Sequence, residues 1–336
     1  MMYKFFPTIL LPLVFLAATC EKTVTEEENP LIYRQRMISF VNSISNYAQE
    51  QDSDFIVIPQ NGIQLLTRSQ QSNNKLFPNH NYLDAIDGIG RESVFYGYNA
   101  DNEATPPDPR AYINRYLQLA QTFGKKVMVT DYASDVPKMK DSYAINDSLG
   151  YISFAANHRE LDVIPPYPEQ PHEVNNRDIH RLDQAENYLY LLNTQNFETK
   201  SEFVDKLAST NYDLFIIDLF FHADQPLTPS DLQKLKTKAN GGERLLIAYM
   251  SIGEAEDYRY YWKRIWERYP PLWLGEENPN WEGNYLVQYW QPEWQNIILG
   301  NEDAYLDRIL AAGFDGVYLD LVDAYRNFEQ AKEQES

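Results

Sequence analysis

Apolar residues gather in short runs along the chain, and most runs are separated by segments with apolar residues at helical spacing. Each run has the length of a β-strand that is buried on both faces. The predicted strands are DFIVIPQ from residue 54, LDAIDGIG from 83, KKVMVTDYA from 125, NYLYLLN from 187, YDLFIIDL from 212, RLLIAYMS from 244, NYLVQYW from 284 and GVYLD from 316. The predicted helices span about 31–49, 111–123, 201–209, 229–238, 258–269 and 303–312, whereas 134–186 is irregular and predicts a long excursion.

Strands that alternate with helices predict parallel βαβ units, so the expected fold class is α/β. About eight such strands favour a (β/α)8 TIM barrel over an open, doubly wound sheet. The chain begins with a helix that has no strand before it, and it stops soon after the strand GVYLD. Because the ends of a closed ring of strands are neighbours, this order predicts a circularly permuted barrel. The alternative is a barrel truncated after its last strand.

The first twenty residues, MMYKFFPTILLPLVFLAATC, combine a basic Lys4, an apolar run and a cysteine. The apolar run is shorter than the roughly 20 residues of a spanning helix, so 1–20 predicts an export signal. LAATC is similar to the lipid-attachment box of bacterial lipoproteins, although Thr19 stands where a smaller residue is commoner. We expect an anchor at Cys20, on the periplasmic face or cell surface of a bacterium, then an acidic tether (21–30) and one domain (31–336). A plain secretory signal is the alternative.

Charge and motif content narrow the possible chemistry. The net charge of −20 argues against nucleic acid as a partner, because phosphate binding needs clustered Lys and Arg. The acidity suits a cationic substrate, or else serves the solubility of an exported protein. One cysteine allows no internal disulfide, and five dispersed histidines give no metal-binding spacing, so we predict no metal. DGIGRES lacks the third glycine of a dinucleotide site, and neither a P-loop nor GxSxG occurs, so we predict no cofactor.

Acidic and amide side chains stand where several predicted strands end. In a TIM barrel the chemistry takes place at the carboxyl ends of the strands. The residues at such positions are Asp218, Glu254, Asp320, Glu92 and Asp131, with Asn61 beside them. Glycoside hydrolysis needs two carboxyls, one to protonate the leaving oxygen and one to attack the anomeric carbon or activate water. The chain therefore carries enough strand-end carboxyls for a glycosidase.

Several stretches resemble motifs of glycoside hydrolase family 114 and its bacterial and archaeal relatives. In the second half these are IAYMSIGEAEDYRYYW (247–262), NYLVQYW (284–290) and GFDGVYLDLVDAY (313–325), and NYLYLLN and YDLFIIDL resemble the first two strands of the family. In the first half, IVIPQNGIQLL (56–66), IDGIGRESVFYGYN (86–99) and KKVMVTDYA (125–133) resemble motifs that normally follow GFDGVYLD. The resemblance implies a TIM barrel whose halves stand in reversed order, with the cut after the fifth family strand.

The resemblance also implies an activity and a catalytic pair. Characterised members are endo-α-1,4-polygalactosaminidases, so the expected substrate is a polysaccharide such as α-1,4-linked galactosaminan. The catalytic acids of the family lie in the GxxxD motif of the fifth strand and at the end of the seventh, which are Asp320 and Glu92 here. The alternative role of Asp320 is to cap the following helix. Retention of configuration would place the two carboxyls about 5–5.5 Å apart, and inversion about 6.5–9.5 Å.

Further residues are candidates for binding the substrate, and most of them have a structural alternative. The candidates are Asp218, Tyr249, Glu254, Arg259, Trp290, Asp323, Asn61 and Asp131. The acids suit a positively charged sugar, or they accept hydrogen bonds that order the site, and Glu254 and Arg259 alternatively form an ion pair. Asn61 binds a sugar hydroxyl or simply forms a turn, and Trp290 stacks on a sugar ring or packs in the core.

These inferences predict an exported, lipid-anchored, endo-acting glycoside hydrolase that contacts a membrane only through its anchor. The first alternative is a carbohydrate-binding lipoprotein that keeps the barrel without the chemistry. The second is a glycosidase that cleaves another linkage. The sequence makes no prediction of the oligomeric state.

Overall fold

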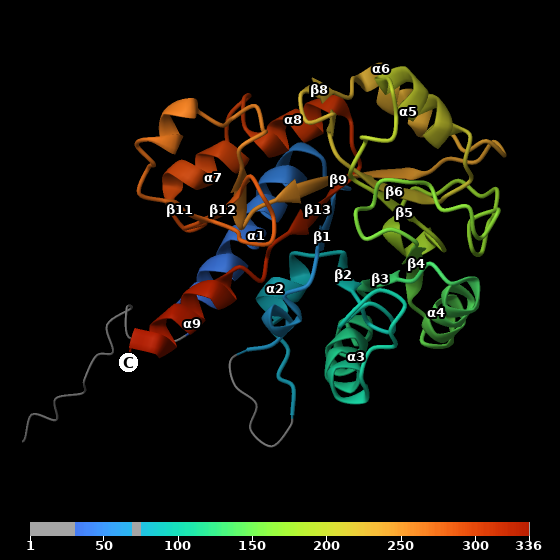
Figure 1. Ribbon diagram of the computed structural model, residues 1–336, viewed down its shortest axis with the longest axis horizontal. Coiled ribbons are helices and arrows are strands. Elements are labelled where there is room, and N and C mark those ends of the chain that lie inside the picture. The colour runs from blue at the N-terminus through green and yellow to red at the C-terminus, as the bar shows by residue number, and fades with distance from the viewer. Residues whose placement is uncertain (1–30, 69–74, 336) are drawn as a thin grey trace, which may run out of the picture.

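The computed structural model describes residues 31–68 and 75–335, so the predicted signal, the tether and Cys20 lie outside the described residues. The described chain is a mixed α/β fold in which helices surround a central parallel sheet (Figure 1). The helices are α1 (Ile32–Gln51), α2 (His80–Asp84), α3 (Pro107–Thr122), α4 (Val136–Ser148), α5 (Lys200–Ala208), α6 (Pro229–Leu235), α7 (Pro292–Ile298), α8 (Tyr305–Ala312) and α9 (Tyr325–Glu335). Shorter 3-10 turns are η2 (Ile63–Leu66), η3 (Leu182–Gln184) and η4 (Arg264–Glu267).

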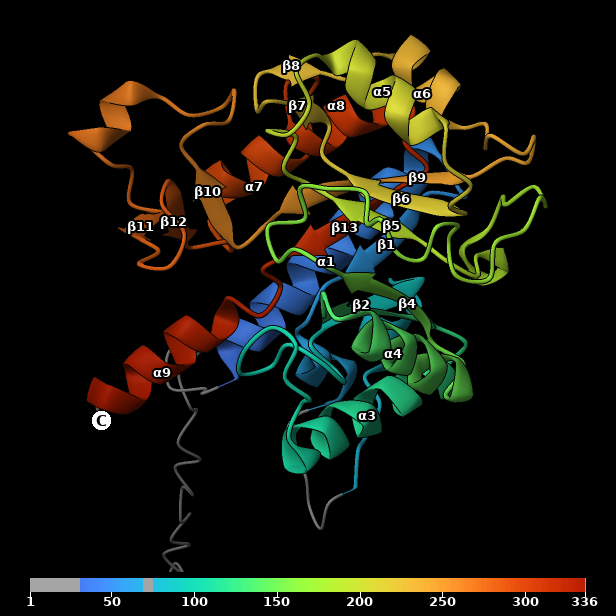
Figure 2. The same ribbon diagram turned by 45° about the vertical axis from the view of Figure 1, so that its right-hand side comes forward.

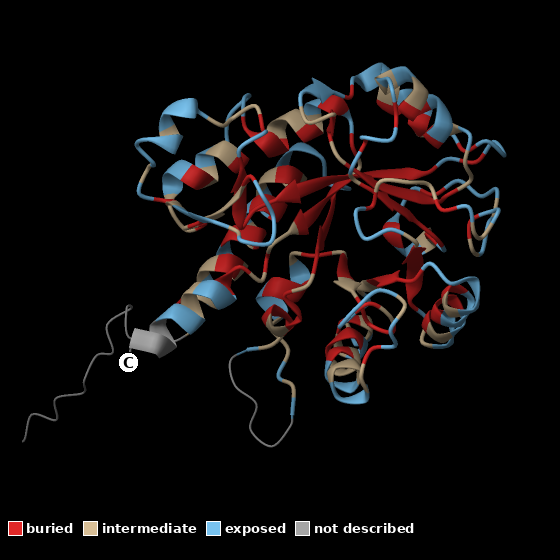
Figure 3. Cartoon of the chain, in the orientation of Figure 1, coloured by how far each residue is buried: buried red, intermediate tan, exposed pale blue. Residues whose placement is uncertain are grey.

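The central strands belong to two parallel sheets. Five strands pair in the order β1 (Ile56–Pro59), β13 (Gly316–Asp320), β9 (Leu245–Ser251), β6 (Leu214–Ile217) and β5 (Leu189–Leu191), and three pair in the order β2 (Gly88–Glu92), β3 (Lys126–Tyr132) and β4 (Ile152–Ala156). Nearly all their residues are buried, whereas the outer faces of the helices are exposed (Figure 3). Burial on both faces explains why these strands read as continuous apolar runs.

The two sheets contact each other along both pairs of outer strands. Beside β1 and β2, Gln60 forms a parallel bridge with Gly90, and the N–H of Asn61 donates to the Gly90 carbonyl at 2.8 Å. Beside β4 and β5, the contact runs through Tyr188, which precedes β5. Its hydroxyl lies 3.0 Å from that of Thr130 in β3, and its ring centroid lies 5.9 Å from that of Phe154 in β4.

Two predictions about the strands are wrong. The segment 134–186, predicted as an irregular excursion, holds helix α4 and the central strand β4, all five of whose residues are buried. The sequence ISFAA gives little indication of a strand, because Ser and Ala have low strand propensity. The run from 284 is not a central strand. It forms β12 (Asn284–Val287), which pairs antiparallel with β10 (Glu254–Glu256) and β11 (Leu274–Glu277). Three of its four residues are half exposed, unlike those of the central strands.

The predicted helix over 258–269 is also wrong, because only the short turn η4 forms there. Arg259 turns inward to a buried ion pair, and Tyr260 and Tyr261 pack edge to face with centroids 5.5 Å apart. These tertiary contacts override the helical spacing of the apolar residues. A further small hairpin, β7 (Phe220–Phe221) with β8 (Gln225–Pro226), lies between β6 and α6. The other predicted helices form, with ends shifted by a few residues.

The first and last helices of the described chain lie side by side (Figures 1 and 2). The Arg34 guanidinium of α1 donates to both oxygens of Glu329 in α9, with Nε–Oε1 and Nη2–Oε2 distances of 2.9 Å. The rings of Tyr33 and Phe328 stack with centroids 5.3 Å apart. The apolar face of α1, with Phe40, Val41 and Ile44 at helical spacing, is buried against the rest of the core.

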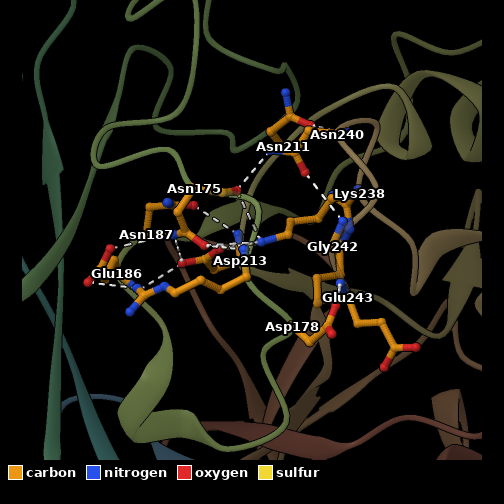
Figure 4. A network of polar contacts seen from close by, with 12 residues as sticks. Asn175, Asp178, Glu186, Asn187, Asn211, Asp213, Lys238, Asn240, Gly242 and Glu243 are labelled. Atoms are coloured by element: carbon orange, nitrogen blue, oxygen red, sulfur yellow. Dashed lines mark hydrogen bonds and ion pairs between the residues drawn. The ribbon is translucent and has the colours of Figure 1, made fainter.

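A buried ion pair ties the amino ends of three central strands together (Figure 4). Lys238 Nζ lies 3.0 Å from Asp213 Oδ1, and neither side chain is exposed to solvent. The other oxygen, Asp213 Oδ2, accepts from the Asn175 amide at 2.8 Å and from the Glu186 N–H at 3.0 Å. Asn187 accepts the N–H of Asp213 at 2.9 Å. The long segment before β5 is therefore fixed to the start of β6 and to the approach to β9.

Candidate active site

The alternation of side chains along β2 and β13 brings the two predicted catalytic acids onto one inner face. Gly90 of β2 faces Tyr318 of β13 so closely that a Cβ at Gly90 would overlap the phenol. Side chains two residues apart point to the same face of a strand, so Glu92 and Asp320 also point inward. Each ends its strand, so both carboxyls lie at the carboxyl ends of the central strands, Glu92 in one sheet and Asp320 in the other.

Asp320 is held by two donors. The Tyr249 hydroxyl of β9 donates to Asp320 Oδ2 at 2.7 Å, and the Leu321 N–H donates to Oδ1 at 2.7 Å. Leu321 is the next residue, whereas α9 begins only at Tyr325, so this contact is not a cap on the first turn of that helix. Burial, followed by the nearby charge of Glu92, raises the pKa of Asp320 from 3.8 to about 7.

Glu92 is held by a second phenol and an amide. The Tyr132 hydroxyl, at the end of β3, donates to Glu92 Oε1, and the Asn61 amide donates to Oε2 at 3.3 Å. The Arg91 guanidinium in turn donates to Asn61 Oδ1, which fixes the amide with its nitrogen toward Glu92. Asn61 therefore lies at the candidate site. Tyr132 was not predicted as a site residue, although it stands two positions after the inward-facing Thr130.

The backbone is strained beside both carboxyls. Leu321, directly after Asp320, has a φ of 58°, and Ser93, directly after Glu92, has a φ of 57°. Asn61 has a φ of 62°. Residues other than glycine rarely adopt this left-handed conformation, which costs of order 1–3 kcal/mol and clusters at functional sites. The sequence gives no sign of this strain, because neither Leu nor Ser is typical of left-handed positions.

Asp218 and Arg259 belong to one buried ionic network. The guanidinium of Arg259 donates from Nη1 to Asp218 Oδ1 at 2.9 Å and from Nε to Glu256 Oε2 at 2.6 Å. Tyr258 donates to the other oxygen of Glu256 at 2.7 Å. Arg259 thus pairs with Asp218 and Glu256, not with Glu254 as the structural alternative supposed. The network orders the loop that follows β9.

Glu254 and Asp323 add negative charge near the predicted catalytic pair. The Asn278 amide donates to Glu254 Oε1 at 2.8 Å, and burial raises the pKa of Glu254. Burial also raises the pKa of Asp323, although the nearby Arg326 and Arg91 oppose this rise. Asp323 in turn raises the pKa of both Asp320 and Glu254 through its charge. These carboxyls therefore form one acidic region at the edge of the sheet.

Asp131 and Trp290 are not brought to this region. Asp131 points outward from β3 and is fully buried, where it accepts from the N–H of Phe95 at 2.9 Å and from the Ser142 hydroxyl of α4 at 2.7 Å. Trp290 packs against α1 and α9, with its ring centroid 5.2 Å from that of Tyr33 and 4.8 Å from that of Phe328. Both contacts correspond to the structural alternatives stated for these residues.

A group of metal-ligand side chains lies outside the acidic region. In the part of the chain that the structure describes, Asp147, His172 and Glu173 bring possible ligand atoms within 4.8 Å of one another. His172 Nε2 already pairs with Asp147 Oδ2 at 2.7 Å, and the two acids are exposed. None of the helices in residues 31–68 and 75–335 is both long and apolar enough to cross a membrane.

Comparison with known proteins gives a match over the second half of the chain. Residues 182–336 match the model of glycoside-hydrolase family GH114, which confirms the predicted resemblance for this segment. Similar proteins are uncharacterized proteins of Methanocaldococcus jannaschii (45% identical over 129 residues), Deinococcus radiodurans (46% over 126) and Thermotoga maritima (38% over 125). These matches cover 37–38% of this chain and 36–38% of each relative. Asp320 lies inside the segment that matches the family, and Glu92 lies outside it.

Proposed function

We propose that this protein is an endo-acting glycoside hydrolase whose catalytic groups are the carboxyls of Asp320 and Glu92. The observation that carries the proposal is their arrangement. Two inward carboxyls end two different strands, each accepts a hydrogen bond from a tyrosine, and each precedes a residue in the left-handed conformation. The match of residues 182–336 to a glycoside-hydrolase family supports the same reaction class.

The raised pKa of Asp320 suits the reaction. Glycoside hydrolysis needs one carboxyl that carries a proton and one that is ionised at the working pH. The pKa of Asp320 is about 7, and its rise is caused by burial and by the charge of Glu92. Near neutral pH Asp320 therefore carries a proton in a substantial fraction of molecules, which is the state that a general acid requires.

The fold that we propose is a circularly permuted (β/α)8 barrel. It is supported by eight parallel strands in two sheets whose outer strands are neighbours, and by the contact of α1 with α9. The strand from 284 lies outside the central sheets, and β4 takes a place in them. Four central strands therefore lie before residue 157 and four after it. In the proposed barrel the cut would follow the fourth strand of the family order, not the fifth.

The substrate that we propose is an α-1,4-linked galactosaminan, and the location is the outer side of a membrane, with a lipid on Cys20. Asp323 and Glu254 support a cationic substrate, because free amino groups on a sugar polymer would meet their charges at the edge of the site. The export signal and the attachment box in the sequence support the location.

The test is the release of reducing ends from galactosaminan, in acetylated and deacetylated form, by wild type, Asp320→Asn and Glu92→Gln. We expect activity in the wild type and a loss of at least about a hundredfold in each variant, with unchanged folding. Wild-type activity in either variant would exclude that carboxyl from the catalytic pair. If the wild type binds galactosaminan without cleaving it, and Asp320→Asn binds equally, the protein is a carbohydrate-binding lipoprotein instead.

A further inference from the structure

Tyr132 is fixed in place on its backbone as well as at its hydroxyl. Its N–H donates to the Tyr96 carbonyl at 3.2 Å, and its carbonyl accepts the N–H of Asn102 at 3.0 Å, both from the loop between β2 and α3. The residue is only 3% exposed, and its hydroxyl donates to Glu92. The orientation of the Glu92 carboxyl therefore depends on where this ring stands.

Arg159 covers the ring of Tyr132. The central carbon of its guanidinium lies 3.8 Å from the ring centroid, in the geometry of a cation–π contact. Arg159 follows β4, and two groups of the β2–α3 loop hold it. Its Nε donates to Asp101 Oδ1 at 2.8 Å, and its Nη2 donates to the Gly97 carbonyl at 2.8 Å. The guanidinium is thereby placed without any direct contact with Glu92 or Asp320.

Gly97 has no side chain and so leaves space for the contact between the Arg159 guanidinium and the Tyr132 ring. Its φ is 104°, a conformation open to glycine but unfavourable for other residues. A Cβ at this position would lie 2.9 Å from the Cβ of Tyr132 and 3.2 Å from Nη2 of Arg159. Residues from the loops that follow β2 and β4 thus converge on the phenol ring at the end of β3, the one that donates to Glu92.

We propose that Arg159 is a positioning residue that acts on Glu92 through Tyr132. A cation over the face of a phenol draws electron density from the ring, which makes the hydroxyl a stronger hydrogen-bond donor. The same contact keeps the ring from turning, so the carboxyl is held in one orientation before the substrate arrives. Asp101 and the Gly97 carbonyl hold Arg159 in turn. This inference rests on the proposed hydrolase function and extends it to a residue that touches neither carboxyl.

The experiment compares Tyr132→Phe, Arg159→Met and Arg159→Lys with the wild type on deacetylated galactosaminan oligomers. Arg181→Met is the matched control, because Arg181 is exposed and pairs with the exposed Asp183. We expect kcat to fall about 10- to 100-fold in Tyr132→Phe and Arg159→Met, because small misplacements of a catalytic group cost rates of this size. KM should change less than about 3-fold, since the ground-state contacts of the sugar are kept. Arg159→Lys keeps the cation, so its kcat should stay within about 5-fold of wild type.

Two results would overturn the inference. One is a kcat within about 2-fold of wild type in Arg159→Met, and the other is a loss that appears in KM alone. The melting temperature of each variant is measured in parallel, because a loss of fold would lower kcat without any positioning role. Should Arg159→Met unfold, the decision passes to Arg159→Lys and Tyr132→Phe, whose kcat values must then differ by at least about 5-fold to support the inference.

Failure of the proposed function and failure of this inference give different results. If the wild type cleaves no galactosaminan, the hydrolase proposal fails, and the Tyr132–Glu92 contact is judged by thermal unfolding alone. The melting shifts of Tyr132→Phe, Glu92→Gln and the double variant form a cycle. If the melting shift of the double variant equals the sum of the two single shifts, Tyr132 and Glu92 are not coupled, and the proposed positioning of Glu92 through Tyr132 is overturned. A double variant that melts above the additive expectation would support it.

Discussion

Replacing Asp320 by Asn should stabilise the protein at alkaline pH while it removes activity. The pKa of Asp320 is raised from 3.8 to about 7 in the folded protein by burial and by the charge of Glu92. A carboxyl whose folded pKa is raised binds its proton more tightly in the folded state, so stability is lost as the pH rises from about 4 through 7. Because a tenfold change in proton affinity is about 1.4 kcal/mol, the ionised carboxyl lowers the free energy of unfolding by about 4 kcal/mol at pH 8 and about 1 kcal/mol at pH 4.5.

An asparagine removes this pH-dependent cost and keeps the local contacts. Its amide oxygen can accept the Leu321 N–H, and the Tyr249 hydroxyl can rotate to accept from the amide nitrogen. The gain of Asp320→Asn over wild type should therefore be about 3 kcal/mol larger at pH 8 than at pH 4.5. Any constant difference between an amide and a protonated carboxyl cancels between the two pH values.

Urea unfolding at the two pH values measures this difference, and tryptophan fluorescence is a suitable signal because the chain has six tryptophans. Asp303→Asn is the matched control, since the Asp303 side chain is 80% exposed and pairs with Arg308 at the surface. Its effect should stay within about 0.5 kcal/mol at both pH values. An equal gain of Asp320→Asn at pH 4.5 and pH 8 would refute the reasoning, because it would show that ionisation of Asp320 costs the fold nothing.

Two further changes probe the frame around the site. Lys238→Met leaves the buried Asp213 carboxylate without its cation, so we expect the free energy of unfolding in urea to fall by about 3–5 kcal/mol. Lys234→Met is the control and should lower it by less than about 1 kcal/mol, because its pair with Asp205 is half exposed. A small effect of Lys238→Met would contradict the buried pair. Gly90→Ala should cost about 3 kcal/mol or more, because the added methyl overlaps the Tyr318 phenol, and Tyr318→Leu in the same chain should restore part of it. If the double variant is no more stable than Gly90→Ala, the destabilisation does not come from a clash with Tyr318.

The central strands could largely be predicted from the sequence because burial on both faces leaves a continuous apolar run. Seven of the predicted runs coincide with central strands, including GVYLD at β13 and the run from 54 at β1. The sequence does not predict strand β4, because ISFAA is short and contains residues of low strand propensity. The run from 284 is equally apolar, but it forms part of a small antiparallel sheet, where the ring centroid of Tyr285 lies 4.9 Å from that of Trp262. Apolar content alone does not tell these two environments apart.

The candidate site could be predicted only in part. Acids at strand ends can be read from the sequence, which gives five candidates, and only the resemblance to the family selects Asp320 and Glu92 among them. The direction of each side chain follows from the period of two, so the parity of β3 separates the outward Asp131 from the inward Tyr132 once one inward residue is known. The ion pair of Arg259 with Glu256 and Asp218 has no such rule, because it joins loops of different strands.

The two ends of the central sheet differ in what they contribute to stability. At the carboxyl ends, left-handed Leu321 and Ser93 and the mutual repulsion of Asp320 and Glu92 raise the free energy of the folded state. At the amino ends, the fully buried Lys238–Asp213 pair has its hydrogen bonds satisfied and locks the start of the strands. Backbone strain at the carboxyl ends of the strands persists only because packing elsewhere in the fold holds the backbone in place. We therefore expect substitutions in the Lys238–Asp213 pair to lower the free energy of unfolding without altering the chemistry of Asp320 and Glu92.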